Sequence, residues 1–154
     1  MTKDFLIYEL QNSLKFFLTV VSGFHESDSD YAPQTGVYTV AAQIEHAALT
    51  VEWFIDGAFS SGFNMDFEEH DRTAREAKSI SQSVDHLKKT FAKLVMLIET
   101  NDLAVFQESL PEGSPMEGPK YGVLFGVIDH TAHHRGALSQ YLRSMGKVPP
   151  MPYM

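Results

Sequence analysis

The sequence predicts an all-α protein folded as a four-helix bundle. Four segments repeat apolar residues every three or four positions, the spacing that places them on one face of a helix. The stretches between these segments are rich in Gly, Pro, Ser and Asp, which favour loops. A chain of 154 residues without an internal repeat is expected to form a single domain, 1–154. The predicted helices span residues 2–22, 39–59, 73–100 and 122–145.

The first and third predicted helices each have one apolar face. In residues 2–22 the apolar positions recur at helical spacing, and Gly23 follows as a typical helix stop. The third helix is expected to begin near Thr73, because Thr73-x-x-Glu76 has the pattern of a capping box. Its apolar face then continues to about Thr100. We expect each of these helices to bury one side in the core.

The second predicted helix, residues 39–59, is apolar on two sides. Besides its main apolar stripe, it carries a second stripe that includes His46 and Trp53. Acidic residues, among them Glu45 and Glu52, lie between the two stripes. Because a helix with two apolar sides is enclosed by neighbours on both, we expect His46 to face the interior of the protein.

Three connections and a tail complete the chain. Residues 22–36 and 60–71 are expected to be loops. The connection 101–119 is long and contains two glycines and three prolines, and its part 103–110 could hold a short strand or a helical turn. The proline-rich tail, 147–154, is expected to be extended. Long structured connections in compact domains often cover a site.

The composition excludes several classes of function. The net charge is −8 and the pI is about 5.2, and no cluster of Lys and Arg occurs, so a nucleic-acid partner is not expected. The absence of cysteine excludes a disulfide scaffold, a thiolate nucleophile and a cysteine-ligated metal site. No apolar run reaches the ~18 residues of a membrane span, and the N-terminus lacks a signal-peptide pattern. We therefore expect a cytoplasmic protein without a membrane partner.

The most informative motif is a pair of histidines on the fourth predicted helix. His130 and His134 are four residues apart, so they project from one face at roughly 40° to each other. That face is otherwise apolar, and buried polar groups are costly unless something satisfies them. His46, on its own enclosed stripe, could reach the same interior. Three neutral imidazoles suit Zn²⁺, Ni²⁺, Co²⁺ or Fe²⁺, and three protein ligands with open positions are typical of a catalytic site.

The remaining histidines receive different interpretations. His133 lies about 60° from the stripe and is expected to support the ligands from behind or to face solvent. His25, His70 and His86 lie in predicted loops or on a helix flank, and we expect them at the surface.

Two known metal-site patterns are absent from the sequence. A di-iron bundle needs Glu-x-x-His on two helices, and this motif does not occur. A zincin needs Glu directly after the first histidine, but Thr131 follows His130. If the protein is an enzyme, its general base must therefore lie elsewhere, or the chemistry must proceed without one.

With these residues the chain resembles the DinB-like family of bacterial proteins, also called the DinB/YfiT-like metalloenzyme family. The resemblance rests on His46 with Trp53 seven residues later, and on the run His130-x-x-x-His134-Arg-Gly. The tail motif Gly-x-x-Pro-Pro, residues 146–150, completes it. Loop lengths and the order of the elements agree over nearly the whole chain.

This resemblance implies an antiparallel four-helix bundle with an unusual long crossover. It implies a divalent metal, often nickel or zinc, held by His46, His130 and His134, and a homodimer. Characterised relatives include S-transferases that use bacillithiol, mycothiol or glutathione, and maleylpyruvate isomerases. The chain departs from the family pattern at Ala137, where relatives often have Gln. We therefore expect the polar contact that this amide gives near the metal to be missing.

Other residues near the proposed site are interpreted from their helix positions. Tyr141 and Trp53 lie two turns after ligands; such residues are more often core, but both could reach the pocket. Asp129 and Glu45 directly precede ligands and could orient a ring.

Three further positions complete this part of the prediction. Arg135 is expected to form an ion pair with an acidic residue of a neighbouring helix, and Gly136 to permit a close helix approach. Tyr153, in the tail, could fold over the metal end.

Two functions remain open from the sequence. The first is an enzyme in which the metal holds a low-molecular-weight thiol as a thiolate that attacks an electrophile in an apolar pocket; metal-dependent hydrolysis is its nearest variant. The second is a non-catalytic dimeric stress or binding protein with a structural metal. The enzyme requires an open coordination position with a pocket beside it.

Overall fold

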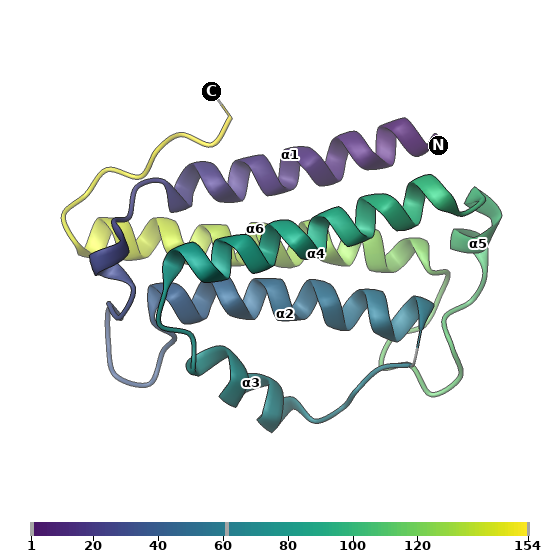
Figure 1. The fold of residues 1–154 in the computed structure, drawn as a ribbon, viewed down its shortest axis with the longest axis horizontal. Coiled ribbons are helices and arrows are strands. Elements are labelled where there is room, and N and C mark those ends of the chain that lie inside the picture. Colours follow the sequence, from purple (N-terminus) through teal and green to yellow (C-terminus); the bar gives the residue numbers. More distant parts are fainter. Residues whose placement is uncertain (1, 61, 154) are drawn as a thin grey trace.

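The computed structural model describes residues 2–60 and 62–153, and these residues confirm the predicted all-α class (Figure 1). Within them no β-strand occurs, and the only β-bridge pairs Ser109 with Pro119. None of the described helices is both long and apolar enough to cross a membrane. The elements are α1 (Lys3–Val21), the 3₁₀ turn η1 (Glu26–Asp28), α2 (Val40–Phe59), α3 (Phe67–Arg75), α4 (Ile80–Thr100), α5 (Leu103–Gln107) and α6 (Tyr121–Ser144).

Four long helices form the bundle, and they are α1, α2, α4 and α6. Helix α1 packs against α4 and α6, and α2 packs against the same two helices. The consecutive helices α1 and α2 therefore lie diagonally across the bundle, with α4 and α6 between them (Figure 1). Their apolar faces meet in one core, whose largest fully buried side chains include Phe17, Ile44, Leu94 and Leu138.

The direction of the helices explains the path of residues 62–79. Helices α2 and α4 pack side by side and run in the same direction, while α1 and α6 run in the opposite direction (Figure 1). Two adjacent parallel helices cannot be joined by a tight turn, so the chain must return along the bundle between them. It does so outside α2, and α3 is part of this return (Figure 1).

The predicted start of the third helix at Thr73 is wrong. Thr73 lies inside α3, and Glu76 is the C-cap of that helix. The long helix α4 begins only at Ile80, after Ser79, whose hydroxyl oxygen accepts a hydrogen bond from the Gln82 backbone N–H at 3.2 Å. The capping-box pattern predicted the wrong helix start because it lies within α3, a short polar helix that the sequence does not reveal. Helix α3 has no apolar stripe and buries only one residue fully.

The predicted loops have more structure than the sequence indicates. The first connection contains η1, and the expected loop 60–71 contains the beginning of α3, which Asp66 caps. In the connection 101–119 the short helix α5 confirms the helical alternative. The tail is extended as predicted and runs back along α1 (Figure 1).

Candidate metal centre

Helices α2 and α6 bring three histidines together inside the bundle. His46 comes from α2, and His130 and His134 come from successive turns of α6. One ring nitrogen of each lies within 4.8 Å of the others, and among the described residues no other group of histidine and acidic side chains converges in this way. The Nε2 atoms of His130 and His134 are 3.0 Å apart. Two nitrogens on one metal ion are also about 3 Å apart when the bonds are about 2.0–2.1 Å.

The environment keeps these three rings neutral at neutral pH. Burial, followed by the neighbouring histidines, lowers the pKa of His46 and of His130 to about 4 each. The same causes lower the pKa of His134, which is only 6% exposed, to about 2. A neutral imidazole has a free lone pair and is the form that ligates a metal.

Gln43 contacts the triad from α2. Its side chain is 6% exposed, and its amide Nε2 lies 2.5 Å from Nδ1 of His134. In this orientation the amide donates to Nδ1, so Nε2 of His134 carries the ring proton and donates to His130. When the amide turns by 180°, its oxygen faces Nδ1 instead, the proton moves to Nδ1, and Nε2 becomes free for a metal. Ala137 offers no amide at the position where relatives often have Gln, but α2 brings the amide of Gln43 to the triad.

His46 is oriented by a chain of polar contacts that leads to α3. The hydroxyl group of Tyr38 lies 3.5 Å from Nδ1 of His46 and donates a hydrogen bond to Asp71 at 2.6 Å. Asp71 in turn accepts from Nε of Arg75 at 2.8 Å. The rings of Tyr38 and His46 are stacked, with their centroids 5.1 Å apart. Because the Tyr38 hydroxyl donates its hydrogen bond to Asp71, the Tyr38 oxygen can accept a hydrogen bond from Nδ1–H of His46. Nε2 of His46 is then available to coordinate a metal.

The residues of the triad fit a metal ion. The neutral rings and the short nitrogen spacing describe a site that could hold a divalent transition metal through His46, His130 and His134. The other ring nitrogen of His130, Nδ1, is buried and has no hydrogen-bond partner among the described residues, and a metal on Nε2 would leave it so.

An apolar cavity of about 260 Å³ opens beside the triad. His46 and His130 form one wall, and Trp53, Phe54 and Phe67 supply most of the rest. Trp53 lines this cavity from α2. Its indole N–H donates to the Asn64 carbonyl at 2.6 Å, which fixes the ring against the returning segment.

His70 also lines this cavity, so its expected place at the surface is wrong. It lies on α3, its ring centroid is 5.6 Å from that of His46, and its Nε2 atom is buried without a partner among the described residues. No signal in the sequence marks this position, because residues 60–71, which include the first part of α3, were expected to form a loop.

Several other predicted residues lie away from the triad. Tyr141 is a core residue whose hydroxyl donates to the Tyr38 carbonyl at 2.9 Å, and it does not line the cavity. Asp129 is exposed, so it does not orient a ring. His133 is also exposed, with its ring 4.9 Å from that of His134, which agrees with the solvent-facing alternative.

The tail packs on the opposite side of α6 from the triad, so its expected place over the metal end is wrong. The ring of Tyr153 lies edge-on to Phe16 of α1, with centroids 5.0 Å apart. Arg135 donates to the Tyr153 hydroxyl at 3.1 Å, and its guanidinium lies over both rings. These cation–π contacts replace the expected ion pair of Arg135, because its neighbours here are aromatic. Gly136 is exposed, and a Cβ atom there would meet no other part of the protein within 4 Å, so it does not permit a close helix approach.

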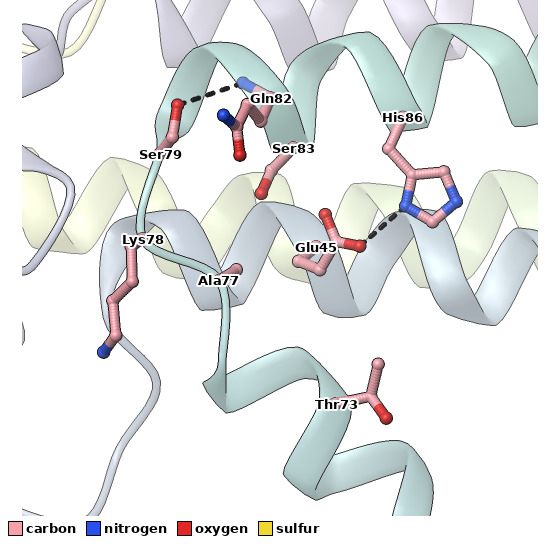
Figure 2. Close-up of a pocket in the computed structure, with 8 residues that line it drawn as sticks. All are labelled: Glu45, Thr73, Ala77, Lys78, Ser79, Gln82, Ser83 and His86. Carbon is pink, nitrogen blue, oxygen red and sulfur yellow. Dashed lines mark hydrogen bonds and ion pairs between the residues drawn. The ribbon is translucent and has the colours of Figure 1, made fainter.

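A second cavity, of about 310 Å³, is separate from the triad; Figure 2 shows its mostly polar lining on α2, α3, α4 and the segment that joins α3 to α4. His86 lies here between two carboxylates of α2, 2.7 Å from Glu45 and 3.3 Å from Glu52. His86 is therefore half-buried and paired, which corrects its expected surface position. Glu45 is committed to this contact and does not orient a ring of the triad (Figure 2).

The fold and the site together define a class: a four-helix bundle with a three-histidine centre of the kind that could bind a metal ion. The profile of the DinB family matches residues 4–154, and the chain belongs to the DinB family. A comparison with curated proteins gave no match.

Two solved structures are similar over most of their length. YfiT from Bacillus subtilis, described as a probable metal-dependent hydrolase with an unusual four-helix bundle topology, has a TM-score of 0.70 at 18% identity, over 94% of this chain and 88% of that one. A DinB-like protein from Bacillus cereus ATCC 10987 has a TM-score of 0.62 at 16% identity, over 93% and 89%. At this identity the similarity shows a shared fold.

Proposed function

We propose that His46, His130 and His134 hold a divalent transition metal, nickel or zinc, and that the protein is a metal-dependent S-transferase that uses a low-molecular-weight thiol. The observation that carries the proposal is the position of the apolar cavity, which adjoins a triad of neutral imidazoles. Three protein ligands would leave coordination positions open for a further ligand from the cavity side.

The chemistry divides between the metal and the side chains of the cavity. A divalent metal, when bound, lowers the pKa of a thiol that coordinates it. The apolar walls, with Trp53 and Phe67, exclude water and favour an uncharged electrophile. In the transfer one sulfur–carbon bond forms, the thiol proton is released to solvent, and the leaving group departs with its electron pair. The thiol must come from outside, because the chain has no cysteine.

Metal-dependent hydrolysis is the second candidate, and the description of YfiT favours it. A hydrolase commonly uses a carboxylate as a general base. No Asp or Glu lines the described cavity beside the triad, which favours thiol transfer over hydrolysis. The third possibility is a homodimeric, non-catalytic binding protein in a reducing cytoplasm, with a structural metal.

Metal content by elemental mass spectrometry is the first test. Protein purified without an affinity tag or chelator should contain about one equivalent of a transition metal. The variant His130→Ala should lose it, and the exposed control His25→Ala should keep it. No metal in the wild type after reconstitution with zinc or nickel would overturn the metal site.

A thiol screen then separates the three functions. The metal-loaded protein is incubated with bacillithiol, mycothiol or glutathione and an aromatic halide, and halide release is measured. Thiol-dependent release that disappears in His130→Ala supports transfer. Hydrolysis of an acyl or phosphoryl ester, measured in a second assay without thiol, would favour the hydrolase. No turnover of the aromatic halide or of the ester would favour the binding protein.

A further inference from the structure

The cavity beside the triad contains a polar atom that the proposed function does not use. Nε2 of His70 is buried and has no hydrogen-bond partner among the described residues. The His70 ring lines the cavity from α3, and Thr50 lines it from α2. An unsatisfied buried imidazole nitrogen destabilises the folded protein, so a hydrogen-bonding group from outside the chain would stabilise it.

The walls of the cavity indicate what kind of molecule would supply this partner. The aromatic rings of Trp53, Phe54 and Phe67 line the cavity. The centroid of the Trp53 ring lies 5.2 Å from that of Phe54, at an interplanar angle of 57°, and 6.1 Å from that of Phe67, at 56°. Tilted aromatic walls favour a flat ring packed edge-on or offset against them. A volume of about 260 Å³ is at the small end for ligand sites, which limits the guest to a small ring system.

In the metal-free protein, the lining of the cavity disfavours ionic guests. No Lys, Arg, Asp or Glu lines the described cavity. Without a bound metal, a carboxylate or an ammonium group would therefore be desolvated there without a counter-charge. A neutral group that can both donate and accept a hydrogen bond avoids this cost and fits an imidazole nitrogen in either tautomer.

We propose that the cavity binds a small neutral aromatic compound with a hydroxyl group, a phenol, with its ring against Trp53 and its hydroxyl on Nε2 of His70. As a substrate class this assignment rests on the proposed function, because the same cavity adjoins His46 and His130. The binding itself needs no metal. His70 acts as a positioning residue that selects the guest and sets its orientation relative to the triad.

The test uses phenol and toluene on the metal-free, full-length protein. The two probes have nearly the same shape, and a methyl group replaces the hydroxyl in toluene. Trp53 is the only tryptophan of the chain, so its fluorescence reports directly on the occupied cavity. We expect phenol to bind about tenfold more tightly than toluene, the effect of one buried hydrogen bond.

Two variants of His70 assign this preference. His70→Phe keeps a ring but removes the hydrogen bond, so the preference should fall to about one; His70→Gln restores a polar group and should recover part of it. The exposed control His25→Phe should behave as the wild type. Equal binding of both probes by the wild type, binding of neither, or an undiminished preference in His70→Phe would each overturn the assignment, and the wild-type ratio alone decides if His70→Phe does not fold.

This experiment separates the two proposals. If the metal-free protein prefers phenol but takes up no metal, the phenol site stands and the metal-dependent transfer fails. If metal binds at the triad but phenol does not bind in the cavity, the metal site stands and the phenol assignment fails.

Discussion

At the scale of single residues, Gln43 is placed to set which nitrogen of His134 carries the proton. Its amide can present either a donor or an acceptor to Nδ1 at the same position, and only the acceptor leaves Nε2 free. Gln43 therefore links the hydrogen-bonded, metal-free state of the triad to a state ready for a metal.

Replacing Gln43 by Leu should weaken metal binding about 10–100-fold, the usual effect of removing a hydrogen bond that orients a ligand. The measurement is a competition titration with a chromophoric chelator, for zinc and for nickel. The exposed Gln140 on α6 provides the control, and Gln140→Leu should bind as the wild type does. An unchanged dissociation constant in Gln43→Leu would show that the amide does not set the tautomer.

The buried histidines should make the metal-free protein sensitive to acid. Their pKa values in the folded protein, about 4, 4 and 2, lie below the value of 6.5 that applies to the unfolded chain. Between pH 6.5 and about 4 the unfolded state therefore binds more protons, so the free energy of unfolding falls as the pH falls. It should decrease by several kcal/mol over this range, since one pKa unit corresponds to about 1.4 kcal/mol.

Urea unfolding at a series of pH values measures this dependence. Above pH 6.5 these groups should contribute no slope. The double variant His130→Leu/His134→Leu removes two of the three titrating groups and should flatten the curve. A wild-type stability that does not change from pH 6.5 to 4 would contradict the lowered pKa values.

The sequence predicted part of this site because spacing on a helix is a local property. The pair His130 and His134 is fixed by the helical repeat, and the enclosed stripe of α2 indicated that His46 faces inward. Gln43 and Tyr38 were missed because their roles depend on which residue of another helix they meet. His70 was missed for a further reason, since it lies on an element that itself was not predicted.

At the scale of elements, Gly57 lets the segment after α2 fold back onto that helix. A Cβ atom at Gly57 would overlap the ring of Phe63. That ring packs edge-on against Trp53, with centroids 4.7 Å apart. Glycine is therefore required here for close approach, the role that the sequence analysis assigned to Gly136.

Gly57→Ala should destabilise the protein by about 1–3 kcal/mol, because Phe63 must leave its position. Gly136→Ala is the matched control: it lies in α6 with no neighbour within 4 Å, and it should stabilise the protein by about 0.5–1 kcal/mol through helix propensity. Urea unfolding measures both. Equal effects of the two substitutions would show that Phe63 does not hold the segment.

The elements were predicted as far as apolar periodicity reaches. The four long helices have stripes that the sequence displays directly, and all four were found. Helix α3 has nine residues, of which only one is fully buried, so it produces no periodic signal. Its position depends instead on the contacts of Tyr38 with Asp71 and of Phe67 with Trp53, which only the folded chain brings together.

At the scale of the whole molecule, the triad joins two helices that are far apart in the sequence. A metal at the triad would bind the folded state alone, because the unfolded chain does not hold the three rings together. At a free metal concentration 100 times the dissociation constant, the gain is about 2.7 kcal/mol.

This gain should raise the melting temperature by roughly 5–10 °C for a chain of this size. The measurement is differential scanning calorimetry of the metal-loaded protein and of the same protein after treatment with EDTA. In His130→Ala, neither metal nor EDTA should shift the transition. A wild-type transition that is the same with and without bound metal would mean that the ion binds outside the folded core.

The parallel packing of α2 and α4 has an evolutionary consequence. The chain between them has to travel the length of the bundle, and on its way it supplies Phe67 and His70 to the cavity. Its two ends are anchored by long helices, while its interior packs on α2. Substitutions, insertions or a wholesale exchange of this stretch would therefore change which guest is admitted and leave the core intact. In bundles of this topology, the segment between α2 and α4 can therefore be exchanged as a unit. Differences in ligand specificity should concentrate in this segment, as they do in the binding loops of other folds.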